Sequence, residues 1–206
     1  MAKLVRHRTL DAEILGSSPS PAAMVLTQSF QKLNRGDKAL DFSLKGVDDK
    51  TYSLSDFTGK EGLLVLFICN HCPYVKTKID TIVKLQEKWK DKVAFVGINS
   101  NDPEYEGEGM ESMKAFAKER NMGFPYLLDE TQEVAKAYGA TCTPDPFLFD
   151  KDFNLVFHGR IDDALEPGQE VKENTMDDNI TKLLSGDVIS DELKPSMGCS
   201  IKWLPS

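Results

Sequence analysis

The stretch that decides the fold is "GLLVLFICNHCPYVKTK", residues 62–78. It begins with a short, continuous apolar run, which is typical of a strand buried on both faces of a sheet. It continues with a C-x-x-C spacing, Cys69 to Cys72, which a proline follows directly. Proline is favoured at the first position of a helix, and apolar residues at helical spacing continue to about Lys90. The stretch therefore predicts a strand, a turn with two cysteines and a helix that Cys72 caps.

The segments around this stretch extend the pattern in both directions. Apolar runs alternate with helical patterns, and a second hairpin and a last helix follow. This order predicts an α/β fold with a central mixed β-sheet and helices on both faces. Strands are expected at 39–57 (two, with a turn at 48–50), 92–100, 123–129 and 146–160 (a hairpin turning at 150–152), and helices at 110–120, 130–139 and 171–186.

The chain of 206 residues fits one domain with extensions. Residues 1–35 are predicted to be an N-terminal extension, with a linker-like "GSSPSPAAM" and a short helix in "VLTQSFQKLN". The domain is expected to span 36–185, and residues 186–206 are expected to form a C-terminal tail packed on it.

Charge and hydropathy exclude several classes of function. The net charge of −8 disfavours binding to nucleic acid or to an anionic membrane, since both require a basic surface. The longest apolar run, Leu63 to Ile68, is too short to cross a bilayer. The first residues, "MAKLVRHRTLDAEILG", lack the pattern of a secretory signal, so we expect a cytoplasmic protein. In that compartment its four cysteines are expected to serve transient redox chemistry or metal binding.

Cys72 is the predicted nucleophile. A thiolate that caps a helix faces free backbone N–H groups and the positive end of the helix dipole, and both lower its pKa. In a thioredoxin-type pair the second cysteine lies three residues after the first, inside the helix, and here that position is Val75. Cys69 precedes the nucleophile instead. It is either the last buried residue of its strand or the cysteine that resolves a mixed disulfide.

Four segments together resemble one protein family. They are "RGDKALDFSLKGVDDKTYSLSDFTGKEGLLVLFICNHCPY", "VGINSND", "YGATCTPDPFLFDKDFNLVFHGRIDD" and "GCSIKW". They are similar to the peroxiredoxin-like branch (alkyl hydroperoxide reductase/thiol-specific antioxidant, redoxin) of the thioredoxin superfamily. The resemblance covers residues 36–185 and implies a thioredoxin-like fold. It also implies that Thr143-Pro144 is a cis-proline loop opposite the nucleophile. Such a loop presents backbone groups to a partner's extended chain, beside His71 and Pro73.

The sequence departs from the resemblance at positions that carry chemistry. Peroxiredoxins have a threonine or serine three residues before the nucleophile and a proline seven before it, where this chain has Cys69 and Val65. Thioredoxins have an acidic residue six before the nucleophile, where this chain has Leu66.

The remaining candidates have alternative interpretations. Cys142 is expected on the rim near Cys72 and is a second candidate for the resolving cysteine. Cys199 could reach another site from the tail, although packing of the tail by Ile201 and Trp203 explains it as well. His71 could favour the thiolate, but a solvated spacer is the commoner role of a histidine in such a turn.

One charged residue and one acidic loop could also lie near the thiols. Arg160 could favour the thiolate through its fixed charge, although an ion pair with Asp162 or Asp163 is preferred. The acidic loop "EYEGEGMES", residues 104–112, is expected to be solvated. A soft metal site at Cys69, His71 and Cys72 is conceivable but lacks a second cluster of ligands, so no metal and no cofactor are predicted.

These observations predict a thiol-disulfide oxidoreductase in which Cys72 attacks and Cys69 or Cys142 resolves. The second hypothesis is a peroxiredoxin-like thiol peroxidase, in which Cys72 becomes a sulfenic acid. The third is a non-catalytic module that binds a peptide or a metal in the cis-proline groove. The expected partners are a thiol or disulfide protein, a small thiol or a peroxide, with no nucleic acid and no membrane. The chain is expected to be a monomer or a homodimer.

Overall fold

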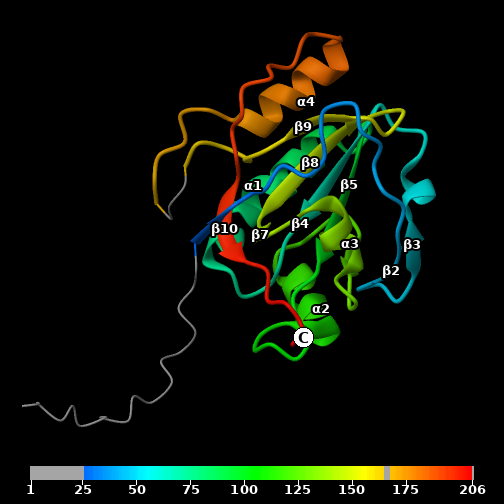
Figure 1. Ribbon diagram of the computed structural model, residues 1–206, viewed down its shortest axis with the longest axis vertical. Coiled ribbons are helices and arrows are strands. Elements are labelled where there is room, and N and C mark those ends of the chain that lie inside the picture. The colour runs from blue at the N-terminus through cyan, green and yellow to red at the C-terminus, as the bar shows by residue number, and fades with distance from the viewer. Residues whose placement is uncertain (1–25, 165–167, 206) are drawn as a thin grey trace, which may run out of the picture.

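The computed structural model describes residues 26–164 and 168–205. A seven-stranded sheet runs through its centre in the order β3-β2-β6-β5-β4-β8-β9 (Figure 1). The strands are β2 Ser43–Gly46, β3 Thr51–Ser53, β4 Gly62–Phe67, β5 Val93–Asn99, β6 Tyr126–Leu128, β8 Asp145–Asp150 and β9 Leu155–His158. The helices are α1 Pro73–Trp89, α2 Gly109–Glu119, α3 Glu133–Tyr138 and α4 Thr175–Ser185, with a short 3-10 helix at Leu54–Phe57.

The apolar run that opens the deciding stretch is the central strand β4. Every residue of β4 is buried, and the strand lies parallel to β5 and antiparallel to β8. The parallel pairs β4–β5 and β5–β6 and the antiparallel pairs at both edges confirm the predicted mixed sheet. Because β4 alternates its side chains between two covered faces, it needs apolar residues at every position.

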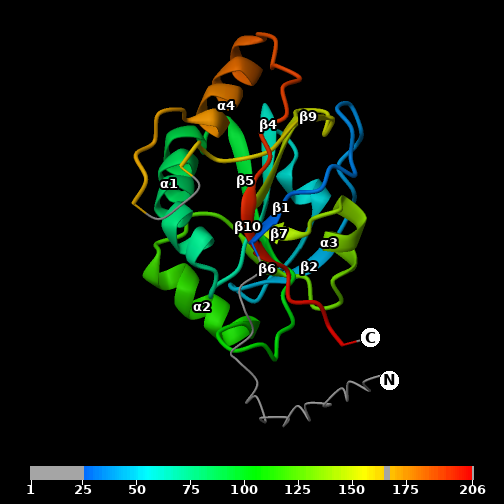
Figure 2. The same cartoon turned by 60° about the vertical axis from the view of Figure 1, so that its left-hand side comes forward.

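Helices cover both faces of the sheet, as the sequence predicts. Figure 2 shows α1, α2 and α4 on one side of the strands and α3 on the other. Leu64, Leu66 and Ile68 pack into the core under the three helices, while Leu63, Val65 and Phe67 pack into the opposite core. The helix expected to end at Gly139 does so, because this glycine adopts the left-handed conformation with φ 78°.

A second, three-stranded sheet was not predicted. It has the order β1-β10-β7, with β1 at Leu26–Gln28, β7 at Cys142–Thr143 and β10 at Met197–Ser200. The helix expected at residues 25–34 is therefore wrong where the structure describes them. The other residues of the expected N-terminal extension, 1–25 with their linker-like stretch, lie outside the described residues.

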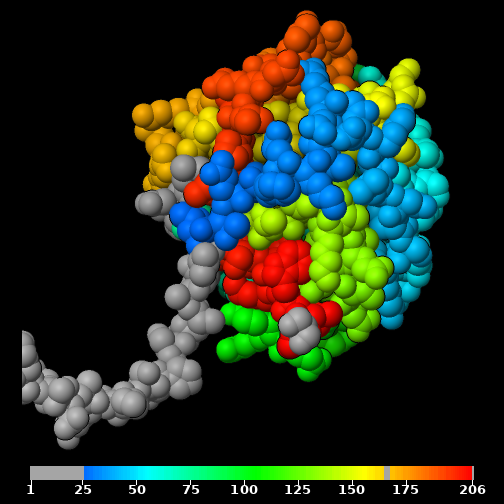
Figure 3. All heavy atoms as spheres, in the orientation of Figure 1, coloured from blue at the N-terminus to red at the C-terminus, as the bar shows by residue number. Residues whose placement is uncertain are grey.

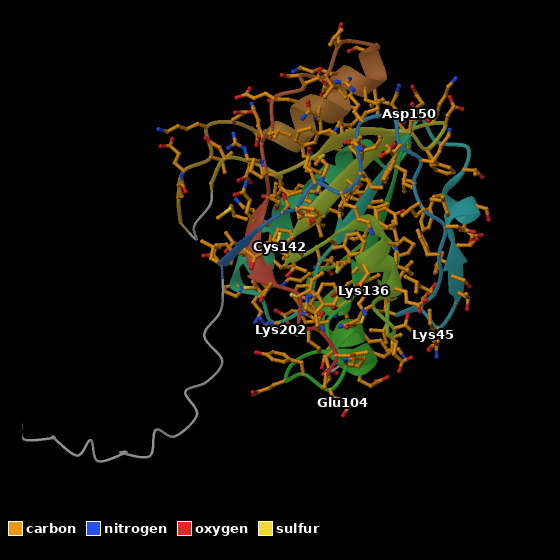
Figure 4. The ribbon with its side chains drawn as sticks, in the orientation of Figure 1. Lys45, Glu104, Lys136, Cys142, Asp150 and Lys202 are labelled. Carbon is orange, nitrogen blue, oxygen red and sulfur yellow. The ribbon has the colours of Figure 1, made fainter. Side chains whose placement is uncertain are left out.

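This second sheet brings both ends of the described chain to one edge of the domain. β10 lies between β1 and β7 and pairs antiparallel with both. Figure 3 shows the blue N-terminal segment and the red C-terminal segment side by side on the molecular surface. Figure 4 shows Cys142 beside β10, far from Asp150 at the opposite end of β8. Within the described residues, no helix is both long and apolar enough to span a bilayer.

Candidate active site

Cys72 caps helix α1, as the sequence predicts. Its backbone is extended, and Pro73 follows at the first helical position. The side chain is 0% exposed, so the thiol lies in the interior and not on the rim of the domain. Burial at a helix start places the sulfur against free backbone N–H groups in a medium of low dielectric.

The loop that contains Thr143 touches both cysteines of the C-x-x-C segment. The Thr143-Pro144 peptide bond is cis, which confirms the prediction. The Cys69 sulfur lies 3.1 Å from the Thr143 hydroxyl oxygen, and the Cys72 sulfur lies 3.3 Å from the Thr143 carbonyl oxygen. The cis-proline loop therefore lies directly against the candidate nucleophile.

Cys199 reaches the site from the tail, which is one of the two alternatives that the sequence leaves open for it. Strand β10 pairs with β7 so that Cys199 faces Thr143. In this register the Cys199 sulfur lies 2.7 Å from the Cys72 sulfur. A disulfide requires about 2.05 Å, so a movement of less than about 1 Å would join them. All four cysteines are buried free thiols.

Gly198 allows β10 to approach the cis-proline loop this closely. A Cβ atom at this position would lie 1.9 Å from the Thr143 carbonyl oxygen and 3.2 Å from the Pro144 nitrogen. The Ser196 hydroxyl donates a hydrogen bond to the Pro144 carbonyl oxygen on the same side. The "GCSIKW" segment is thus built to lie on the loop, and the tail does more than pack on the domain.

The thiols of Cys69, Cys72 and Cys199 lie together, and their pKa values are shifted in different directions. Hydrogen bonds from Cys199 and then from Cys69 hold the pKa of Cys72 well below that of a free cysteine, against the opposing effect of burial. The hydrogen bond to Cys72 and burial raise the pKa of Cys199. Burial, the hydrogen bond to Cys72 and the charge of Glu108 raise the pKa of Cys69. These shifts favour negative charge on Cys72 over Cys69 and Cys199.

A thiolate titration tests whether Cys199 lowers the pKa of Cys72. In Cys199→Ala the strongest hydrogen bond to the Cys72 sulfur is lost, so we expect its pKa to rise by about one to two units. The matched control is Cys142→Ala, which removes a buried thiol that makes no such hydrogen bond. The measurement is the ultraviolet absorbance of the thiolate against pH in the reduced protein. Equal curves for the two variants would contradict the assignment.

Cys142 does not have the position expected of a resolving cysteine. It faces Ser200 in the register of β7 with β10, one residue away from the Cys199–Thr143 pair. Successive residues of a strand point to opposite faces, so Cys142 points away from the side that carries Cys199. Burial and the charge of Asp145 raise the pKa of Cys142. The structure therefore favours Cys199 over Cys142 as the partner of Cys72.

His71 is not the solvated spacer that was expected. Its side chain is 16% exposed, and its Nδ1 atom forms a hydrogen bond with the Glu108 carboxylate. Glu108 belongs to the acidic loop that was expected to be solvated, yet its side chain is 0% exposed. No periodicity or spacing in the sequence indicates a role for Glu108, because it enters the site from the end of a loop 36 positions after Cys72.

Cys69, His71 and Glu108 form a close cluster of polar side chains, but the protein itself already supplies partners to the carboxylate. Ligand atoms of Cys69, His71 and Glu108 lie within 4.8 Å of one another. Glu108 already accepts hydrogen bonds from the backbone N–H groups of Asn70 and His71, and Asn99 donates to its second oxygen at 2.6 Å. The carboxylate is thus engaged by the protein itself, and the cluster is better described as part of the thiol site.

Arg160 pairs with an acid that was not predicted. Its guanidinium donates to Glu173 at 2.9 Å and to the Thr175 hydroxyl at 3.1 Å. Asp162, one of the two expected partners, instead pairs with Lys78. Arg160 lines a small cavity of about 20 Å³ beside Pro144, but none of the four cysteines lines it.

Comparisons with known proteins identify the family and the fold. Residues 35–158 match the model of the AhpC/TSA family. A solved structure of an uncharacterized conserved protein from Geobacillus kaustophilus is 41% identical, with a TM-score of 0.84, and the match covers 89% of this chain and 99% of that one.

Two curated relatives match about three fifths of this chain. The thiol-disulfide oxidoreductase ResA of Bacillus thuringiensis subsp. konkukian is 27% identical over 61% of this chain and 69% of its own. The chloroplastic peroxiredoxin Q of Populus jackii is 34% identical over 60% of this chain and 54% of its own. With a family model that matches more than half of its length, a cis-proline loop and a cysteine at the start of α1, the chain belongs to the AhpC/TSA family, with a thioredoxin-like fold.

Proposed function

We propose that the protein is a thiol-disulfide oxidoreductase in which Cys72 is the nucleophile and Cys199 is the resolving cysteine. The observation that carries the proposal is the 2.7 Å separation of their sulfurs beside the cis-proline loop. It revises the assignment of the resolving role to Cys69 or Cys142. Relatives named as a thiol-disulfide oxidoreductase and as a peroxiredoxin support the same class of chemistry.

The exchange has two steps. The Cys72 thiolate attacks one sulfur of a substrate disulfide, forms a mixed disulfide with it and releases the other sulfur as a thiolate. Cys199 then loses its proton and attacks the Cys72 sulfur, which forms the Cys72–Cys199 disulfide and releases the second substrate thiolate. The two thiolates take up the proton of Cys199 and one from the solvent. Two electrons pass from the protein dithiol to the substrate.

The low pKa of Cys72 serves both directions of this exchange. A thiol of low pKa is mostly ionised at neutral pH, and it is also a good leaving group when a disulfide is broken. Cys199, with its raised pKa, remains a protonated donor until the mixed disulfide removes the charge from Cys72. The same pair could therefore reduce a substrate disulfide or, once oxidised, pass its disulfide to a substrate dithiol.

The structure gives less support to peroxide reduction. The hydroxyl expected three residues before a peroxidatic cysteine is replaced by the Cys69 thiol, and Arg160 forms its ion pair with Glu173. Thr143 does offer a hydroxyl, but its oxygen lies against Cys69 and only its carbonyl oxygen lies against Cys72.

A substrate comparison tests the proposal. The reduced protein is mixed in turn with oxidised glutathione and with hydrogen peroxide, and the loss of its thiols is followed in single turnover. We expect oxidation by the disulfide to be the faster reaction at equal concentration. Faster oxidation by peroxide, with a sulfenic acid trapped at Cys72, would support the thiol peroxidase instead. No reaction of Cys72 with either would support a binding module.

A further inference from the structure

Glu108 is a buried acid at the thiol site that neither the family resemblance nor the proposed exchange uses. It precedes helix α2, and its side chain lies in the interior beneath the turn between Cys69 and Cys72. Within residues 26–164 and 168–205, no lysine or arginine forms an ion pair with it, and its one ionic partner is His71. A buried carboxylate without a fixed cation is costly unless several donors surround it.

Four donors do surround the carboxylate, and three of them come from the turn. The backbone N–H groups of Asn70 and His71 each donate to it at 3.1 Å, and the His71 ring completes the set from the turn. The Asn99 amide supplies the fourth donor at 2.6 Å. Both oxygens of the buried carboxylate therefore have hydrogen-bond partners, which offsets the cost of burying it.

The same loop holds the turn at a further point. The Asn70 side-chain amide donates to the Gly107 carbonyl oxygen at 3.1 Å, and the Tyr126 hydroxyl donates to the Asn70 side-chain oxygen at 2.9 Å. Both residues between the two cysteines are thus fixed to the loop that ends at Glu108. This fixes where Cys69 and Cys72 meet Thr143.

The charge of Glu108 also acts on the neighbouring thiol. Its carboxylate is close to the Cys69 sulfur, at most 4.8 Å from ligand atom to ligand atom, and a second negative charge there would be repelled. The other titratable groups that face this carboxylate are His71 and, through Asn70, Tyr126. Tyr105 packs against His71 with ring centroids 4.9 Å apart and ring planes tilted by 42°, and the Lys202 ammonium lies 5.7 Å from the centre of the Tyr105 ring.

We propose that Glu108 is a positioning residue of the thiol site, which holds the Asn70–His71 turn and keeps Cys69 as the protonated thiol that donates to Cys72. Negative charge is thereby directed to Cys72, the sulfur that faces Cys199. Thioredoxins have an acidic residue on the central strand, six positions before the nucleophile, where this chain has Leu66. Here the buried acid near the thiols is Glu108, from the loop that precedes α2. It deepens the proposed function but is tested on the titration of Cys69, which does not depend on turnover.

The test uses a background that retains only one cysteine. In Cys72→Ala/Cys142→Ala/Cys199→Ala, the thiolate absorbance reports Cys69 alone. Adding Glu108→Gln removes the charge but retains an oxygen that can accept the backbone hydrogen bonds. We expect the pKa of Cys69 to fall by about one unit on this substitution. The matched control is Glu111→Gln, an acid on the exposed surface of the same helix, which should leave the titration unchanged.

Two further results decide the outcome. In the protein with all four cysteines, Glu108→Gln should lower the rate of disulfide reduction at high pH more than at low pH, because Cys69 then loses its proton, and with it the hydrogen bond to Cys72, at a lower pH. Glu108→Ala should also lower the thermal stability. If Glu108→Gln leaves the Cys69 titration where it was, the charge has no role and the proposal is overturned. Failure of the protein to reduce disulfides would contradict the proposed function but would leave the Cys69 titration as a valid test of Glu108.

Discussion

Cys72→Ser is expected to lower the rate of disulfide reduction by on the order of 10³-fold or more, because the exchange has no other ionised sulfur at its centre. A serine hydroxyl is close in size to the thiol, so the fold should remain. The hydroxyl does not ionise near neutral pH and cannot form the mixed disulfide. The measurement is the single-turnover rate of thiol loss with oxidised glutathione at saturating concentration.

Cys142→Ser provides the matched control for this result. It changes a thiol that is also buried and also lies beside the cis-proline loop, but that faces Ser200. We expect its rate to stay within a few-fold of the unchanged protein. If Cys142→Ser were as inactive as Cys72→Ser, or if Cys72→Ser retained the rate, Cys72 would not be the nucleophile.

The second large effect is expected from Gly198→Ala. The added Cβ atom would lie 1.9 Å from the Thr143 carbonyl oxygen and 2.6 Å from its carbonyl carbon, so β10 must move away from β7. Overpacking of this kind costs about 1–3 kcal/mol, which corresponds to about a fivefold to 140-fold larger population of molecules in which β10 has moved away from Cys72. Cys72, buried under β10, should therefore react with iodoacetamide faster by about that factor when both proteins are measured well above its pKa.

Ser200→Ala is the control in the same strand, because it changes a half-buried side chain and leaves the backbone approach intact. It should alkylate at the rate of the unchanged protein. Hydrogen exchange at residues 197–200 should be faster in Gly198→Ala alone. An unchanged alkylation rate in Gly198→Ala would show that β10 does not cover the nucleophile.

Much of the fold could be predicted, because its elements carry strong local signals. β4 is a continuous apolar run, α1 begins with a proline, and α3 and α4 end at glycines. The cis-proline loop was predicted from the family resemblance, and the position of Cys72 from its place before Pro73. These features depend on residues close together in the sequence, and the structure confirms them.

The second sheet could not be predicted, because its strands are short and pair across the length of the chain. β7 has two residues and β1 has three, and neither shows the alternation that marks a strand. β10 is separated from β7 by more than 50 residues, and its sequence begins with methionine and glycine. The role of Cys199 depends on this pairing, so the sequence alone could not decide whether Cys199 reaches another site or only helps to pack the tail.

Glu108 was missed for a related reason. A charged, glycine-containing loop usually remains in the solvent, and nothing near Glu108 in the sequence indicates the donors that compensate its burial. Those donors come from the Asn70–His71 turn and from the end of β5. Only the packing of three segments shows that this acid belongs to the site.

The most direct test of the account is a peptide map of the oxidised protein. The reduced protein is treated with one equivalent of oxidised glutathione, the remaining thiols are alkylated at acidic pH, and the disulfide-linked peptides are identified by mass spectrometry. The account predicts a Cys72–Cys199 disulfide within one chain, with Cys69 and Cys142 alkylated after unfolding. A Cys69–Cys72 or Cys72–Cys142 disulfide in its place would contradict the assignment of Cys199 as the resolving cysteine.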